Sequence, residues 1–203
     1  MDTDIDALLR RSAITQLLRG WGLWRDTGDW ARLRACYAPG ARMRTTWFDG
    51  DAGDFVEASR RMAGVGGGSV QHFIGASVIE STDDRALAAT RIQLLVRGQL
   101  AGTPVDVACY GRFHDRLVRH DGQWRIARRE PVYDKDILRP VMPDARLEID
   151  AEALARFPAH YRFTAYLQSL GGATITPDLP APQSAQERQL QADDQSWLHP
   201  NSQ

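Results

Sequence analysis

Residues 105–133 read VDVACYGRFHDRLVRHDGQWRIARREPVY and contain the pattern that decides the fold. Apolar and polar side chains alternate in the first half, as expected for a β-strand whose neighbouring side chains point to opposite faces. The Asp121-Gly122 pair that follows is a strong hairpin signal. The stretch therefore predicts two antiparallel strands, over 105–120 and 123–133. One face of the first strand is predicted to point inward and to carry Val105, Val107, Cys109, Gly111 and Phe113.

Working outward from this hairpin, the preceding segments predict two more strands, over 70–81 and 85–100, and a shorter one over 42–48. Apolar residues at helical spacing predict a first helix over 5–24. Asp29 and Asp54 are suited to cap further helices over 30–37 and 54–62, and residues 64–69 are expected to form a loop. Because helices precede an antiparallel meander, the chain is predicted to be α+β, with helices covering one face of a curved sheet.

The segment after residue 139 differs in character from the rest of the chain. We expect one domain over 1–139 and a C-terminal extension over 140–203 with one or two helices and a flexible tail. The helices are expected over 151–170 and 184–198, on either side of a proline-rich connector. The second could be an oligomer arm, a lid or a poorly anchored tail.

Composition excludes several classes of protein. Among the 203 residues, 43% are hydrophobic and 25% are charged, with a net charge of −1, so no basic stripe for nucleic acid is expected. No apolar run approaches the roughly 20 residues that a membrane-spanning helix needs. With no secretory signal visible at the N-terminus, we expect a cytoplasmic protein that binds neither nucleic acid nor membrane. Cys36 and Cys109 are expected to be buried thiols.

The common signatures of nucleophilic serines, nucleotide-binding loops and zinc sites are missing from the sequence, so we expect neither a cofactor nor a metal. An acid–base site is the remaining candidate. His72 opens a predicted strand among apolar neighbours, and a buried imidazole needs a hydrogen-bond partner. Asp26, at the end of the first helix, is the natural partner. The pattern alone favours a hydrogen-bonded core histidine at His72 and a turn or capping aspartate at Asp26. The other four histidines are expected at the surface: His114, His120, His160 and His199.

Three segments carry a resemblance to a known family: RDTGDWARLR (residues 25–34), QHFIG (71–75) and DGQWRI (121–126). Their order and spacing resemble the SnoaL-like branch of the nuclear transport factor 2-like superfamily, and are most similar to scytalone dehydratase and hexachlorocyclohexane dehydrochlorinase. The resemblance spans about residues 5–135. It implies a cone-shaped α+β barrel in which a curved antiparallel sheet wraps around the N-terminal helices.

The same resemblance implies roles for three residues. His72 would abstract a proton from carbon, Asp26 would orient His72, and Arg129 would stabilise the leaving group. Strict alternation puts Trp124, Ile126 and Arg128 on one face of the last strand and Arg125, Ala127 and Arg129 on the other, so which arginine points inward stays open. The tyrosines of the dehydratase are replaced, by Arg25 before the aspartate and by Thr45 on the first strand, which disfavours scytalone as the substrate.

Large apolar residues predict a pocket for an aromatic or polycyclic molecule, although the same side chains could simply fill the cone. The substrate-binding candidates are Trp21, Trp24, Met43, Trp47, Cys109, Gly111 and Phe113. The expected activity is that of a cofactor-independent lyase that eliminates water, halide or a one-carbon aldehyde. The alternatives are an isomerase with the same dyad, or a non-catalytic binding or scaffold domain. A homo-oligomer, a dimer or a trimer, is expected in either case.

Overall fold

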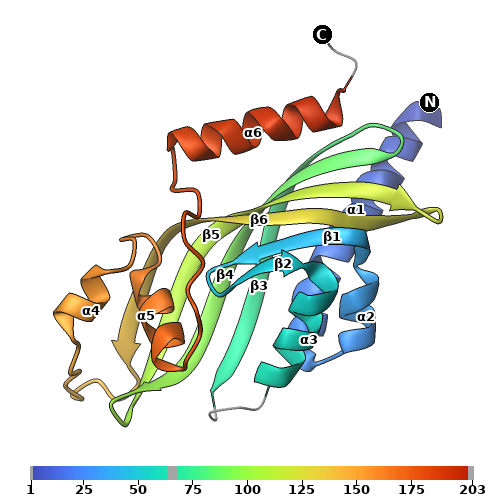
Figure 1. Cartoon of the computed structure of the whole chain (residues 1–203). Helices are drawn as coiled ribbons and strands as arrows, with labels where there is room; N and C mark the ends of the chain where they lie inside the picture. Colours follow the sequence, from blue (N-terminus) through green and yellow to red (C-terminus); the bar gives the residue numbers. More distant parts are fainter. Residues whose placement is uncertain (1, 64–67, 201–203) are drawn as a thin grey trace.

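A computed structural model of the chain describes residues 2–63 and 68–200 (Figure 1). Most of the loop expected over 64–69, and the last residues of the expected tail, lie outside the described residues. The elements are α1 (Asp2–Thr27), α2 (Trp30–Ala35), β1 (Tyr37–Thr45), β2 (Phe48–Asp51), α3 (Ala52–Met62), β3 (Ser69–Ser81), β4 (Arg85–Leu100), β5 (Thr103–His120), β6 (Gln123–Pro140), α4 (Ala151–Ala155), α5 (Arg162–Leu170) and α6 (Ala185–Leu198).

The strands form one curved sheet in the order β2-β1-β6-β5-β4-β3. All neighbours pair antiparallel except β1 and β6, which run parallel. The long strands β3 to β6 follow one another through short turns, as the sequence predicts. The predicted α+β class and the curved sheet are confirmed.

Helices α1, α2 and α3 pack against the inner face of this sheet, and α6 lies across its outer face (Figure 1). The inward stripe of α1 is fully buried, with Ile14, Leu18 and Trp21 each at most 1% exposed. These side chains join alternate residues of β4, β5 and β6 in one hydrophobic core. The helices thus cover the inner face of the curved sheet, and helices and sheet together form a cone.

The first strand begins earlier than the sequence indicates. Helix α2 ends at Ala35, and the segment Ala38-Pro39-Gly40, expected to be a helix stop, lies within β1. A register shift between Tyr37 and Arg42 bulges this segment out of its pairing with β6. Gly40 has φ +70°, a conformation that glycine adopts without strain. The bulge therefore accommodates a proline and a glycine inside a strand.

Two helix boundaries also differ. Helix α3 is capped by Asp51, not Asp54, since the Asp51 carboxylate accepts hydrogen bonds from the amides of Gly53 (2.7 Å) and Asp54 (3.4 Å). The helix expected over 151–170 is divided into α4 and α5. Pro158 lies at the break, where it has no amide hydrogen to donate and disfavours helical geometry at the residue before it.

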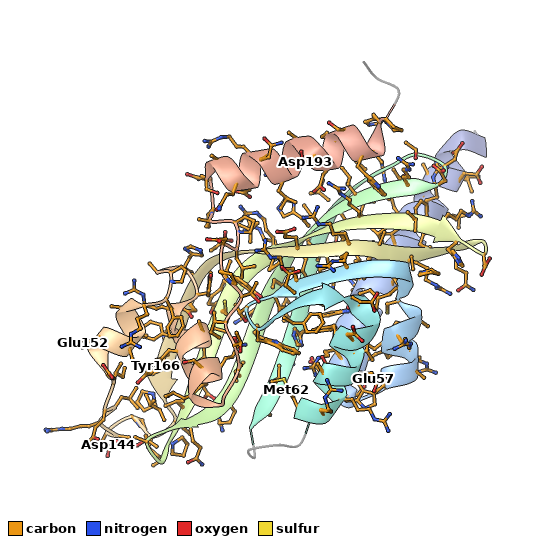
Figure 2. All side chains as sticks on the ribbon, viewed as in Figure 1. Glu57, Met62, Asp144, Glu152, Tyr166 and Asp193 are labelled. Atoms are coloured by element: carbon orange, nitrogen blue, oxygen red, sulfur yellow. The ribbon has the colours of Figure 1, made fainter. Side chains whose placement is uncertain are left out.

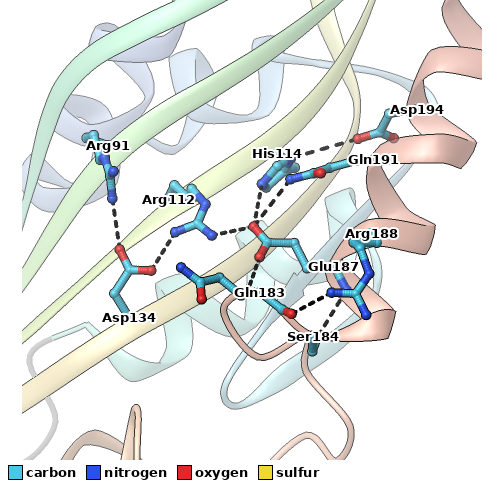
Figure 3. A network of polar contacts seen from close by, with 10 residues as sticks. All are labelled: Arg91, Arg112, His114, Asp134, Gln183, Ser184, Glu187, Arg188, Gln191 and Asp194. Atoms are coloured by element: carbon cyan, nitrogen blue, oxygen red, sulfur yellow. Dashed lines mark hydrogen bonds and ion pairs between the residues drawn. The ribbon is translucent and has the colours of Figure 1, made fainter.

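Helix α6 is held against the sheet by ion pairs, which argues against the poorly anchored tail among the three alternatives that the sequence left open for this segment. Glu187 pairs with Arg112, and Asp194 pairs with Arg116 at 2.6 Å. Figure 3 shows Asp194 pointing from the helix toward His114 of the sheet. His114 lies beneath this helix with 10% of its side chain exposed, so it is not the surface residue that the sequence suggested.

Candidate active site

The last turn of α1 meets the beginning of β3 at Asp26 and His72. The Oδ1 atom of Asp26 lies 2.6 Å from Nδ1 of the His72 ring, and Oδ2 accepts a hydrogen bond of 2.6 Å from the His72 backbone amide. This close approach depends on Gly22, where a Cβ atom would lie 2.7 Å from Cγ1 of Ile74. One carboxylate thus fixes both the ring and the backbone of His72, an arrangement that a merely capping aspartate would not have.

Hydrogen bonding also sets the proton distribution of the His72 ring. An ionised carboxylate can only accept, so Nδ1 carries the proton and Nε2 is left as the free acceptor. Burial lowers the pKa of His72 below its usual value, although the hydrogen bond and the charge of Asp26 oppose that shift. Positive charge on Arg25 and Arg129 lowers this pKa further. At neutral pH His72 is therefore an uncharged, oriented base.

Asp26 and His72 form part of the wall of a cavity of about 1010 Å³. The wall is mainly apolar and aromatic, and includes Trp21, Trp30, Trp47, Phe55 and Phe113. Its opposite side is built by the C-terminal extension, from residues of α5 and the segment 171–173. Met62, at the end of α3, contributes to the rim (Figure 2). The volume is in the range of small-molecule sites in proteins.

Three of the seven predicted substrate-binding residues line this cavity, namely Trp21, Trp47 and Phe113. Trp24 does not, because its ring lies along its own helix over Gly20, where a Cβ atom would be 2.5 Å from it. Met43 does not either. It is 1% exposed in the core behind the cavity wall, where the Tyr37 hydroxyl donates to its sulfur at 3.7 Å.

Cys109 and Gly111, on β5, are also absent from the cavity wall. Cys109 is completely buried, and burial raises the pKa of its thiol to about 12. At Gly111 it is the backbone of β6 that comes close and not a ligand, since a Cβ atom would meet the carbonyl oxygen of Val132 at 2.5 Å. The register shift between Tyr110 and Gly111 places this glycine at a bulge. Both cysteines are buried free thiols, as predicted.

Arg129 lies behind the cavity wall and does not line the cavity. Its guanidinium forms two hydrogen bonds with Asp115, of 2.6 and 2.9 Å, and both side chains are at most 1% exposed. The same guanidinium lies 4.3 Å from the ring centres of Trp21 and of Phe113. Although burial alone would lower the pKa of Arg129, Asp115 holds it above its ordinary value. In this position Arg129 supports two aromatic residues of the wall and is not placed in the cavity, where the resemblance implied that it would stabilise a leaving group.

Two features of the cavity were missing from the sequence prediction. Arg25, noted only as a departure from the family pattern, lies in the wall beside the dyad. The wall formed by α5 includes Gln168, whose side-chain oxygen accepts a hydrogen bond of 2.6 Å from the Thr46 hydroxyl. The apolar spacing within 162–170 predicts a helix, but only the tertiary structure shows which part of the cone it covers.

Among the described residues, no three or more His, Cys, Asp or Glu side chains are grouped to hold a metal ion. Within the same part of the chain, no helix is long and apolar enough to cross a membrane.

Comparison with known proteins identifies the family of this chain and solved structures that share its fold. The model of the family described as "SnoaL-like domain" matches residues 6–130. The curated relatives include pea pathogenicity protein 2 of Fusarium vanettenii, which is 29% identical over 177 residues, covering 85% of this chain and 75% of that protein.

Solved structures with the same fold include two named after eliminating enzymes. A candidate scytalone dehydratase from Novosphingobium aromaticivorans has a TM-score of 0.55 at 21% identity, covering 72% of this chain and 99% of that one. A type 2 hexachlorocyclohexane dehydrochlorinase has a TM-score of 0.55 at 15% identity, covering 73% and 99%. At these identities the likeness shows the cone fold alone, and it agrees with the fold that the sequence predicts.

Proposed function

Because this chain belongs to the family of SnoaL-like domains, we propose that its Asp26–His72 pair is the catalytic dyad of a cofactor-independent lyase. The observation that carries the proposal is the 2.6 Å contact between Asp26 and His72 in the wall of a mainly apolar cavity. The names of the two structural relatives add that this cone fold occurs in a candidate dehydratase and a dehydrochlorinase.

In the proposed reaction, Nε2 of His72 takes a proton from a substrate carbon. The electron pair of that C–H bond forms a double bond to the adjacent carbon, and the leaving group departs from there with its own bonding pair. Asp26 holds the ring in one tautomer and stabilises the imidazolium that forms. His72 then returns the proton to the leaving group or to water, so no co-reactant is consumed.

A mainly apolar, aromatic cavity favours this chemistry in two ways. Low polarity strengthens the attraction between Asp26 and the imidazolium, because charges interact more strongly away from water. Aromatic walls favour a flat apolar substrate. Arg129 is proposed as a positioning residue that supports Trp21 and Phe113 from behind.

A non-catalytic binding or scaffold domain would not need an oriented, uncharged base. The dyad and the open volume beside it therefore favour the enzyme. An isomerase, which returns the proton to a different carbon, would use the same dyad and differs only in product.

Absorbance in the ultraviolet tests the proposal with wild type and the His72→Ala variant. The substrates are aromatic alcohols, halides and diols with an acidic C–H bond next to the leaving group. Wild type is expected to form a new conjugated chromophore and release the leaving group, whereas His72→Ala is expected to lose that activity with an unchanged circular dichroism spectrum. Full turnover by folded His72→Ala would refute the assignment of the base, and a rearranged product with no leaving group released would establish the isomerase.

A further inference from the structure

The charges around the cavity are unequal. Its wall includes three arginines, Arg25, Arg61 and Arg97, while Asp26 is the single carboxylate among the described lining residues. Asp26 is already engaged by His72, and Arg97 is engaged by Asp106. The cavity wall, which is otherwise mainly apolar, thus carries an excess of positive charge.

Arg25 is the arginine next to the dyad in the chain. Its guanidinium lies 5.8 Å from the ring centre of Trp30, which also lines the cavity. In the described part of the chain, no hydrogen bond or ion pair joins its guanidinium to an acidic side chain. Burial lowers the pKa of Arg25, against the attraction of Asp26. A half-buried guanidinium with five donors therefore faces the cavity without the bidentate acid partner that such groups favour.

We propose that Arg25 binds a carboxylate of the substrate, so that the natural substrate is an aromatic or polycyclic carboxylate. This inference rests on the proposed function for the reaction itself. Guanidinium and carboxylate match in shape and form two parallel charge-assisted hydrogen bonds. With the carboxylate held by Arg25 and the ring system against Trp21, Trp47 and Phe55, a neighbouring C–H bond would be presented to His72.

The position of Arg25 also links binding to the strength of the base. Its charge lowers the pKa of His72, together with burial. A carboxylate on Arg25 would offset that charge, which makes protonation of His72 easier once the substrate is bound. The base is then stronger in the complex than in the empty protein.

Arg61 and Arg97 are less suited to this role. Both are exposed, and Arg97 forms two hydrogen bonds with Asp106. Water weakens ion pairs at exposed positions, whereas a half-buried cation beside the reacting group gains more from an incoming anion.

Binding measurements with naphthoate and its neutral counterpart naphthamide test the inference without any turnover. Isothermal titration calorimetry on the full chain should give naphthoate a Kd about 10- to 100-fold lower than that of naphthamide, as expected for a charge-assisted hydrogen-bonded pair. Arg25→Gln should abolish this preference, and Arg25→Lys should restore part of it. Arg60→Gln is the matched control, because Arg60 is exposed on α3 and does not line the cavity. It should keep the full preference.

Equal binding of the two probes by wild type, or a full preference that survives Arg25→Gln, would overturn the inference. A second readout is the pKa of His72 from heteronuclear NMR, which naphthoate should raise in wild type but not in Arg25→Gln. A pKa that stays unchanged in saturated wild type would place the carboxylate elsewhere. His72→Ala keeps Arg25 and should keep the naphthoate preference, so the two proposals fail separately: the lyase fails on turnover and the carboxylate site on binding.

Discussion

The two faces of the sheet use charge in different ways, and strand β5 contributes to both. On the inner face, charged groups are few: Asp26 pairs with His72, and Asp115 of β5 pairs with Arg129, while Arg25 has no acidic partner among the described residues. On the outer face, charges form an extended network under α6 (Figure 3). It runs from Arg91 through Asp134, Arg112 and Glu187, with His114 and Asp194 beside it.

The difference separates two roles: the inner face holds the candidate reactive groups, and the outer face holds the charges that attach helix α6 to the sheet. On the inner face the Trp21 ring contacts both His72 and the Arg129 guanidinium, and Asp26 is the carboxylate that is hydrogen-bonded to the base. On the outer face most charges of the network have two or more partners, an arrangement that ties a helix to a sheet. Helix α6 covers part of the outer face, and homo-oligomerisation stays a prediction.

The largest effect is expected from Asp26→Asn, which removes the negative charge of the inner dyad and replaces one of its two accepting oxygens by an amide donor. Turnover of any substrate accepted in the ultraviolet assay should fall by about 100-fold or more, since a neutral amide cannot stabilise the imidazolium. Measured kcat/KM is the primary readout. Asp29→Asn is the matched control three residues further on, because Asp29 caps α2 by accepting from the amide of Arg32 at 3.1 Å and asparagine caps equally well. Equal kcat/KM in Asp26→Asn and wild type would remove the dyad from the mechanism.

The contact between Asp26 and His72 could be anticipated because periodicity places both residues near the ends of predicted elements, and the resemblance to the family then assigned them to one site. The facing of β5 followed in the same way, since its inward residues are apolar or small from Val105 to Phe113, and the alternation of burial continues to Leu117. Strict alternation along β6 could not predict which face of the sheet the Arg129 side chain lies on. A register shift opposite Arg116 and Leu117 adds one residue to β6 between Ile126 and Arg128, and reverses the alternation there. Trp124, Ile126 and Arg129 are consequently all buried, although strict alternation separates Arg129 from the other two.

The pocket was only half predictable for a related reason. Hydrophobicity identifies which side chains are buried, but it does not separate a residue in a cavity wall from one packed behind it. Trp21 and Met43 are each 1% exposed, and of these two only Trp21 lines the cavity. The part of the wall formed by α5 depends on where the C-terminal extension folds back, which no local pattern specifies.

The next largest effect is expected from Arg129→Met, which leaves the buried Asp115 carboxylate without a partner. Folded stability should fall by about 3–5 kcal/mol, measured by urea unfolding, because an uncompensated buried charge is costly. The double variant Arg129→Met/Asp115→Leu removes both charges and should recover most of that loss. A loss below about 1 kcal/mol in the single variant would contradict a fully desolvated pair. The inner pair would then contribute no more than a solvent-exposed pair of the outer face.

A smaller effect is expected from pH, and it should act on the inner face through His72. Protonation of His72 removes the base, so kcat/KM should rise with pH and then level off. The midpoint should lie below about 6.5, the ordinary value for histidine, since burial lowers the pKa of His72. Below the midpoint kcat/KM should fall about tenfold per pH unit.

The groups charged near His72 are Asp26 and Arg25 on α1 and Arg129 on β6, and the last two favour the lower midpoint. His114→Gln is the control from the outer face, where burial also lowers the pKa of the histidine. This variant should leave the acid limb of kcat/KM in place. A midpoint above the ordinary value would mean that Asp26 outweighs burial.

The smallest effect is expected from Glu187→Gln, on the outer face. Glu187 accepts from Arg112 and from the backbone amide of Gln183 at 2.6 Å, and 5% of its side chain is exposed. Replacing its charge by an amide of similar size should cost about 1–2 kcal/mol, seen mainly as faster hydrogen exchange in α6 with kcat/KM unchanged.

Arg91→Gln tests the exposed end of the same network, for comparison with the buried Glu187. Arg91 pairs with Asp134 at 2.9 Å, but 68% of its side chain is exposed, so water already screens that pair. Its loss should leave the exchange of α6 and the melting temperature unchanged. If Arg91→Gln and Glu187→Gln were equally harmful, the outer network would act as one cooperative unit. If neither loosened α6, attachment would depend on its apolar contacts, such as Leu190 and Leu198, and the contrast between the two faces would be one of packing and not of charge.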